Sequence, residues 1–256
     1  MTSSAPSYPP GTPMWVDLTS PDVKAAARFY GELFGWQAED LGEQAGNYHM
    51  FRKDGKMVAA ASAPMAPGQP PAWTTYVATD DANATAAKVR EAGGQVAMEP
   101  FDVMDAGRMA VFQDPTGAFI AVWQPGNHKG AELANEPGSF TWTELQTRDI
   151  NAAKQFYPKV FGWGIKDSAS GPMTYTEWQV NGRSIAGGMP MDPSIPANIP
   201  PNWLVYFAVE DTEAAVAKAQ QLGGRVMMPP MDTPAGKFAV LADPTGAAFA
   251  VIKISR

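Results

Sequence analysis

Two acidic residues sit at matching places in the chain, and each follows a tryptophan at the same spacing. Asp17 stands two residues after Trp15, and Glu144 stands two residues after Trp142. Side chains two apart on a strand share a face, so each acid would lie beside an indole ring. Such a carboxylate can receive a hydroxyl, an amine or a cation from a ligand. If buried, it has a raised pKa and can act as a general base. The alternative is structural: a strand acid bonded to a backbone amide or an arginine.

Metal chemistry has few donors available in this chain. There is no cysteine, and the only histidines are His49 and His128. Zinc or iron held by nitrogen and oxygen ligands usually needs two or three imidazoles and a carboxylate. Two histidines cannot supply such a site in each half of the chain, so we expect no metal and no cofactor.

The segments that position these residues are duplicated. The stretch WVDLTSPDVKAAARFYGELFGW begins at Trp15 and returns as WTELQTRDINAAKQFYPKVFGW from Trp142, and the turn DPTGA occurs twice. A repeat of this length is the size of a domain and far exceeds a solenoid unit. We therefore predict a tandem duplication. Its expected parts are a flexible N-terminus over 1–11, a first domain over 12–125, a linker over 126–138 and a second domain over 139–256.

Each copy carries strand and helix signals in the order βαβββ, twice over. In the first copy, residues 15–19 have strand character, and apolar residues then recur at helical spacing up to Gly35. Asp54 and Gly55 mark a hairpin, and DPTGA suits a type I turn before the last strand. Pro158 falls inside the matching helix of the second copy, where we expect a kink or a break.

Composition excludes several classes of protein. Apolar residues make up 45% of the chain and charged residues 18%, which suits a packed core. The formal charge of -7 disfavours nucleic acid as a partner. The N-terminus lacks the features of a signal peptide, and the longest apolar run, over 203–209, is too short to span a membrane. We expect a cytoplasmic protein that binds neither nucleic acid nor membrane.

The helix ending FYGELFGW, the passage over 80–94 and the DPTGA turn together resemble the vicinal-oxygen-chelate superfamily. This superfamily includes glyoxalase I, bleomycin-resistance proteins and extradiol dioxygenases. The resemblance covers nearly everything from Met14 to Ile254. The chain is similar in particular to two-domain actinobacterial members described as antigens or hydroxylases. It implies an α+β fold of two tandem glyoxalase-like domains, each made of two paired βαβββ modules that form a half-open barrel.

The resemblance also implies where catalytic members of the superfamily hold a divalent metal. In this chain those positions carry no usual metal ligand. They are Trp15, Thr74 and Ala121 in the first copy, and Trp142, Leu204 and Ala250 in the second. The positions of Thr74 and Leu204 are assigned to within one residue. This departure removes the main reason to infer a metal-dependent lyase, isomerase or dioxygenase.

Strand alternation points further aromatic residues into each cavity. The candidate ligand-binding residues are Trp15, Tyr76, Trp123, Trp142, Tyr206 and His49, and the candidate catalytic residues are Glu144 and Asp17. For the tryptophans Trp15, Trp73, Trp142 and Trp203, the alternative is core packing.

The function that these residues predict is binding of a small aromatic molecule without a metal, by a monomer or a homodimer. One alternative is a metal-independent enzyme, of hydroxylase or lyase type, that uses a cavity carboxylate. Another is a metal-dependent lyase or dioxygenase. One copy could also serve only as a scaffold, and the second copy is the better candidate for that role.

Overall fold

Four segments of the chain share one βαβββ order. The structure, a computed structural model, describes residues 6–170 and 173–255. Domain 1 is built from β1 (Pro13–Thr19), α1 (Val23–Phe34), β2 (Gln37–Asp40), η1 (Glu43–Ala45), β3 (His49–Lys53), β4 (Lys56–Ser62), β5 (Ala72–Ala78), α2 (Ala82–Glu91), β6 (Gln95–Val103), β7 (Gly107–Gln113) and β8 (Phe119–Pro125). Domain 2 is built from β9 (Phe140–Thr147), α3 (Ile150–Phe161), β10 (Gly164–Ser170), β11 (Met173–Val180), β12 (Arg183–Pro190), β13 (Asn202–Ala208), α4 (Thr212–Gln221), β14 (Arg225–Thr233), β15 (Gly236–Ala242) and β16 (Ala248–Ile254).

Each domain forms one open, eight-stranded sheet rather than a closed barrel. The strand order is β2-β3-β4-β1-β5-β8-β7-β6 in domain 1, and β10-β11-β12-β9-β13-β16-β15-β14 in domain 2. The first strands of the two modules pair antiparallel at the centre of each sheet. One face of each sheet packs against helices, and we call the other its inner face. The predicted α+β fold of two tandem domains is confirmed.

The four α-helices of the described residues begin in the same way. In α1 the carboxylate of Asp22 accepts the backbone N–H of Ala25, and the aspartate before each of the other three helices does the same. Such a cap satisfies one of the free N–H groups of the first helical turn. The helices α1 and α3 both end on a glycine in the left-handed conformation, which glycine adopts without strain.

The helix does not break at Pro158, so that part of the expectation was wrong. The helix α3 runs from Ile150 to Phe161. Buried residues on both sides of the proline, Tyr157 and Val160 among them, anchor the helix. The Pro158 carbonyl also accepts the N–H of Gly162 at 2.9 Å. Tertiary packing therefore outweighs the one hydrogen bond that proline cannot donate.

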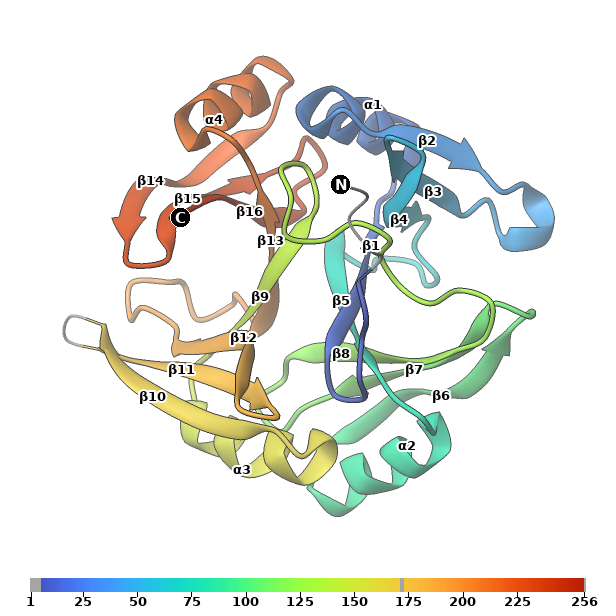
Figure 1. The fold of residues 1–256 in the computed structure, drawn as a ribbon, viewed down its shortest axis with the longest axis vertical. Coiled ribbons are helices and arrows are strands. Elements are labelled where there is room, and N and C mark those ends of the chain that lie inside the picture. The colour runs from blue at the N-terminus through green and yellow to red at the C-terminus, as the bar shows by residue number, and fades with distance from the viewer. Residues whose placement is uncertain (1–5, 171–172, 256) are drawn as a thin grey trace.

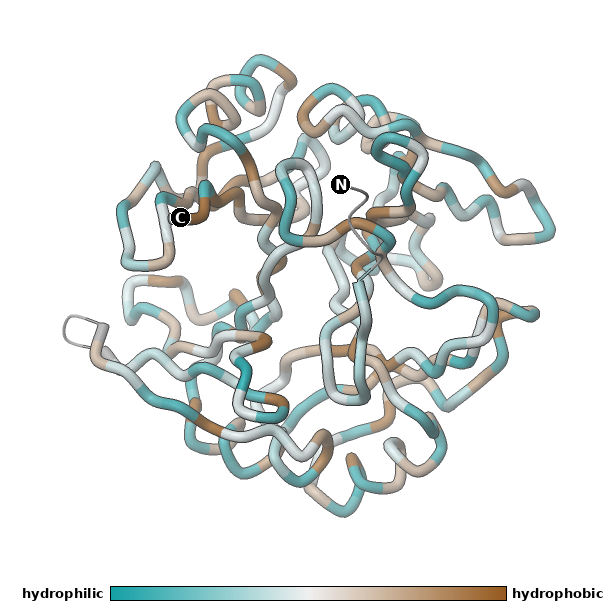
Figure 2. Tube along the Cα trace, viewed as in Figure 1, coloured by the Kyte–Doolittle hydropathy of each residue, from teal (hydrophilic) through white to brown (hydrophobic). Residues whose placement is uncertain are grey.

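Helices of one domain pack against helices of the other. Figure 1 shows α1 beside α4 at one end of the molecule and α2 beside α3 at the other. The aromatic residues of α1 join a core that includes Phe207 and Phe249 of domain 2, and those of α3 join a core that includes Phe112 of domain 1. Hydrophobic residues gather on the central strands and hydrophilic residues along the outer turns (Figure 2). The junction of the domains is therefore a shared core.

The two DPTGA turns hold this junction together. Asp114 Oδ1 accepts the backbone N–H groups of Thr116 and Ala118, which closes the turn. Its Oδ2 accepts the hydroxyl of Tyr157, in the other domain, at 2.7 Å. Trp203 Nε1 donates to the same hydroxyl at 2.9 Å. This turn is therefore also an interdomain contact.

The second turn makes the reciprocal contact. Asp243 Oδ2 accepts the hydroxyl of Tyr30 at 3.1 Å, and Trp73 Nε1 donates to that hydroxyl at 3.0 Å. Trp73 and its counterpart Trp203 are thus core residues of the domain junction, which is the core-packing alternative raised by the sequence. No helix of the part that the structure describes has the length and apolar character needed to cross a membrane.

Candidate functional site

The inner face of domain 1 carries a connected group of four side chains, which we call quartet 1: Trp15, Asp17, Tyr48 and Tyr76. Asp17 Oδ2 accepts the hydroxyl of Tyr76 at 2.9 Å and that of Tyr48 at 3.2 Å. Trp15 Nε1 donates to the Tyr48 oxygen at 3.2 Å. A buried carboxylate is thus held by two phenols, one of which also holds an indole.

The inner face of domain 2 carries the matching four side chains, which we call quartet 2: Trp142, Glu144, Tyr175 and Tyr206. Glu144 Oε1 accepts the hydroxyl of Tyr206 at 3.1 Å. Trp142 Nε1 donates to the Tyr175 oxygen at 3.0 Å. Gln146 adds a long contact of 3.5 Å from its Nε2 to the same glutamate oxygen. The structure therefore brings together six of the predicted site residues in two groups: Trp15, Tyr76 and Asp17, and Trp142, Tyr206 and Glu144.

The sheet explains why these residues meet. Trp15 and Asp17 lie two apart on β1 and point to the same face. The antiparallel register places Tyr76 of β5 directly opposite Trp15. Tyr48 immediately precedes β3, which lies on the other side of β1 beyond β4. The quartet thus gathers side chains from both modules of the domain.

Tyr48 and Tyr175 were missed by the sequence analysis. A signal was present, because the two tyrosines are separated by the same 127 positions as Trp15 and Trp142. The next residue, His49, was predicted instead because its imidazole can bind a ligand.

His49 does not join the quartet. Its Nδ1 lies 2.8 Å from the carbonyl of Asn47, and its Nε2 lies 3.8 Å from Asp40. Alternation on β3 points it away from Met50, which belongs to the inner face. His49 therefore lies outside the quartet, and its contact with a ligand stays a prediction.

Burial sets the protonation of these groups. It raises the pKa of Asp17 to about 6, with the Tyr76 and Tyr48 hydroxyls partly opposing this shift. It also raises the pKa of Glu144. The pKa values of Tyr48 and Tyr76 rise well above the ordinary range, because burial and the nearby carboxylate both disfavour a phenolate. The phenols therefore stay protonated and donate, while the acids titrate closer to neutrality than exposed carboxyls do.

The acid of quartet 2 is one carbon atom longer than that of quartet 1, and the residue beside it on the neighbouring strand is one carbon atom shorter. Asp17 has Ala60 as its register partner on β4, and Glu144 has Gly187 as its partner on β12. A Cβ added to Gly187 would overlap the Tyr175 hydroxyl and lie 2.9 Å from Trp142 Nε1. The longer acid and the missing methyl group therefore go together, and the backbone of β12 supports Tyr175 and Trp142.

Trp123 lies on the inner face of domain 1 beside quartet 1. Its ring centroid is 6.4 Å from that of Tyr76, and its Nε1 donates to the carbonyl of His128 at 2.9 Å. The His128 ring stands edge-on to Trp15, with centroids 4.4 Å apart. The sequence placed His128 only in a linker, so this contact was not anticipated.

Comparison with known proteins identifies the class. Residues 13–122 and 139–251 match the model of the Glyoxalase/Bleomycin resistance protein/Dioxygenase superfamily. The chain belongs to this superfamily.

Two relatives and one solved structure illustrate the likeness. The chain is 44% identical to the anthracycline biosynthesis protein DnrV of Streptomyces peucetius, with 96% of this chain and 94% of the relative covered. It is also 44% identical to CFP32 of Mycobacterium bovis, whose name marks it as a candidate glyoxylase, with 96% of each covered. The Mn(II)-bound glyoxalase of Novosphingobium aromaticivorans shares the fold, with a TM-score of 0.67 at 19% identity over 98% of this chain and 83% of that one.

The residues on the inner face do not fit the metal that the superfamily implies. Trp15 faces Tyr76 across the strand pair, and Tyr76 pairs in turn with Ala121 of the closing strand. Domain 2 has tryptophan, tyrosine and alanine in the same row. Indole and methyl groups offer no ligand atoms, and divalent metals of this chemistry select imidazole and carboxylate. Within residues 6–170 and 173–255, no cluster of three histidine, aspartate or glutamate side chains could hold an ion.

Proposed function

We propose that the protein binds a small planar aromatic molecule on an inner face, through the quartet and without a metal at the superfamily's usual position. The observation that carries this proposal is the quartet itself, because the indole-to-tyrosine and tyrosine-to-carboxylate hydrogen bonds recur in both domains. A buried carboxylate is costly unless it is hydrogen-bonded. Its retention beside an indole in both copies favours a recognition role over simple packing.

Each member of the quartet has a distinct part in this proposal. The indole supplies a flat apolar surface against which an aromatic ring can stack. The carboxylate of Asp17 or Glu144 accepts a hydroxyl or amine of the ligand, while the tyrosine hydroxyls hold the carboxylate in place. Trp123 extends the apolar surface in domain 1. The names of DnrV and of the Streptomyces protein DauV, both anthracycline biosynthesis proteins, support an aromatic ligand of several rings.

A metal-independent enzyme is the second candidate, and the raised pKa values of the two acids favour it. With a pKa of about 6, Asp17 would be largely ionised at pH 7 yet basic enough to take a proton from a ligand hydroxyl. Glu144, whose pKa is also raised, could do the same. Both roles use the same residues, so the experiment must separate binding from turnover.

Titration with 1,4-dihydroxyanthraquinone, a planar hydroxylated probe, tests the proposal. We expect saturable binding by isothermal titration calorimetry that weakens at least tenfold in the Asp17→Asn, Glu144→Gln double variant. His49→Ala is the matched control and should bind like the wild type, because its imidazole points away from the inner face. Equal binding by the double variant and the wild type would refute the role of the acids.

Two further measurements separate the alternatives. The probe should be recovered unchanged by mass spectrometry; a product that forms with the wild type and not with Glu144→Gln would establish an enzyme instead. Elemental analysis that finds about one firmly bound metal ion in each domain would overturn the metal-free part of the proposal.

A further inference from the structure

The inner face of domain 1 is covered by two segments of its own chain. One is the N-terminal stretch around Tyr8, whose hydroxyl donates to the carbonyl of Ala131 at 2.9 Å. The other is the connection between the domains. There, the N–H of Ala131 donates to the Met14 carbonyl and that of Glu132 to the Met57 carbonyl. Tyr8 and Ala131 join the apolar cluster that contains Trp15. These segments therefore complete the packing of the inner face.

A flat ring of the protein already occupies the place beside quartet 1. The His128 ring lies edge-on to Trp15, at 4.4 Å and 82°, and 5.5 Å from Trp123. Its two ring nitrogens are buried and have no hydrogen-bond partner in the part of the chain that the structure describes. Burial lowers its pKa to about 4, so the ring is neutral at neutral pH. His128 thus packs as an aromatic ring rather than as a cation, and Trp15 is left 3% exposed.

Domain 2 has a different set of residues at the matching places. Asn135, an exposed residue, corresponds to Tyr8, because Gly11 and Gly138 make equivalent bonds to Ala78 and Ala208. Ile252 stands where domain 1 has Trp123. Trp142 is half-buried, and no aromatic ring among the described residues pairs with its indole.

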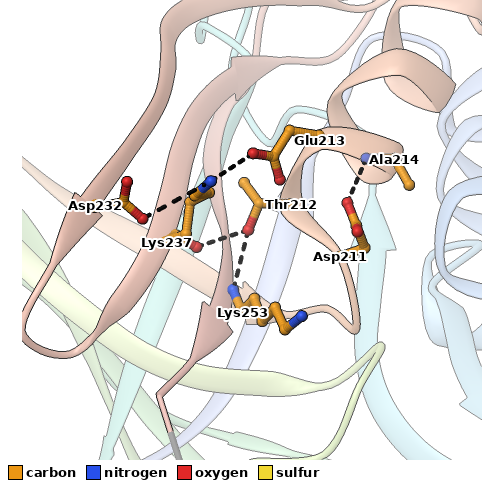
Figure 3. A network of polar contacts seen from close by, with 7 residues as sticks. All are labelled: Asp211, Thr212, Glu213, Ala214, Asp232, Lys237 and Lys253. Atoms are coloured by element: carbon orange, nitrogen blue, oxygen red, sulfur yellow. Dashed lines mark hydrogen bonds and ion pairs between the residues drawn. The ribbon is translucent and has the colours of Figure 1, made fainter.

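A cavity of about 810 Å³ lies where β13 and β16 end in domain 2, and none of the residues that line it belongs to quartet 2. Its walls are residues 135–137, the end of β13, the hairpin between β14 and β15, and the end of β16. Lys237 Nζ lies 2.6 Å from Glu213 and 3.8 Å from Asp232, and Thr212 Oγ1 accepts the N–H of Lys253 (Figure 3). The rim is therefore fixed by polar contacts. The corresponding end of domain 1 has a smaller cavity, of about 230 Å³.

We infer that the two inner faces have unequal roles: domain 2 takes the ligand, one molecule per chain, and His128 fills the matching place in domain 1. This inference rests on the proposed function and names its site. A planar hydroxylated ring would stack on the free face of Trp142 and direct its hydroxyl to Glu144. In domain 1, the imidazole against Trp15 is the internal substitute for that ring. The scaffold role expected for the second copy is thereby reassigned to the first.

Fluorine NMR of protein labelled with 5-fluorotryptophan tests this inference, with Trp142→Phe and Trp15→Phe used to assign the signals. On addition of 1,4-dihydroxyanthraquinone, the Trp142 signal should shift and the Trp15 signal should not, with calorimetry giving one molecule per chain. Trp142→Ala should weaken binding at least tenfold. A shift of Trp15 in the wild type, two molecules per chain, or full binding by Trp142→Ala would overturn the inference while leaving the proposed function intact.

Variants of His128 test directly whether its imidazole takes the place of a ligand ring beside Trp15. The probe is catechol, whose single ring suits the space that the imidazole would leave. In His128→Gly, catechol should shift the Trp15 signal, which it leaves unmoved in the wild type. His128→Phe restores a ring and should behave like the wild type, as should Lys129→Ala, an exposed neighbour. No response of Trp15 in a folded His128→Gly protein refutes the role of His128. If neither the wild type nor any variant binds either probe, the proposed function itself is refuted, and the inference with it.

Discussion

The hydroxyl of Tyr157 donates to Asp114 Oδ2 at 2.7 Å across the junction between the two domains, at a site where both side chains are buried. Tyr157→Phe should therefore lower the free energy of unfolding by about 1–3 kcal/mol, because it leaves a buried carboxylate oxygen and the Trp203 N–H without their partner. Tyr30→Phe should have a similar effect through Asp243. Urea denaturation measures the free energy of unfolding of both variants. Changes under about 0.5 kcal/mol in both would show that these hydrogen bonds between the domains do not stabilise the fold.

A second prediction concerns the stability of the protein between pH 4 and pH 7. The pKa of Asp17 is about 6 in the folded state and 3.8 ordinarily. The folded protein therefore holds the proton more tightly, so this group stabilises the fold below about pH 4. That stability is lost as the pH rises to about 6. Compared with Asp17→Asn, the wild type should lose about 1–3 kcal/mol more between pH 4 and pH 7.

The comparison with the variant is essential because His128 acts in the opposite direction. Its lowered pKa destabilises the folded protein at acid pH, in the wild type and the variant alike. Urea denaturation at four or five pH values gives the difference between the two proteins. Parallel stability curves would contradict the raised pKa of Asp17.

A third prediction concerns the support of quartet 2 by the backbone of β12. Gly187→Ala should displace Tyr175 and Trp142, because the new methyl group would overlap the Tyr175 hydroxyl. We expect a loss of about 1–3 kcal/mol in unfolding free energy and a shifted Trp142 signal in the fluorine spectrum. Adding Glu144→Asp, which recreates the Asp17 and Ala60 pairing of domain 1, should restore part of both. A Gly187→Ala protein that matches the wild type would disprove the close approach.

A fourth prediction concerns the orientation of the Trp142 indole. Tyr175→Phe removes the oxygen that accepts Trp142 Nε1 at 3.0 Å. We expect about tenfold weaker binding of 1,4-dihydroxyanthraquinone, with a smaller effect on stability because Trp142 is only half-buried. Calorimetry measures the affinity and urea denaturation the stability. Equal losses in both would indicate a purely structural bond.

The architecture was predictable because its signals repeat. Two copies of one pattern, each with a capped helix ending on a glycine such as Gly35, establish the element order twice. The break expected at Pro158 was wrong because the local rule for proline in helices takes no account of the buried residues on either side of it. How the two copies pack was not predictable, because the bond from Tyr157 to Asp114 joins residues 43 positions apart that no local pattern links.

The site was predictable only where strand alternation governs it. The parity of β1 placed Trp15 and Asp17 on one face, and register brought Tyr76 to them. Tyr48 precedes its strand, so alternation did not select it. The contact of His128 with Trp15 depends on the path of an irregular connection, which the sequence does not specify.

The paired turns and tyrosines make each half of the molecule hold the other in place. Expressed separately, either half would leave a tyrosine and an aspartate without their counterparts, together with the aromatic surface around them. The peptide connection keeps the two at a high effective concentration, so the pairing need not be strong enough to survive dilution. Because each half is held by the other, one repeat can support its neighbour without itself binding a ligand.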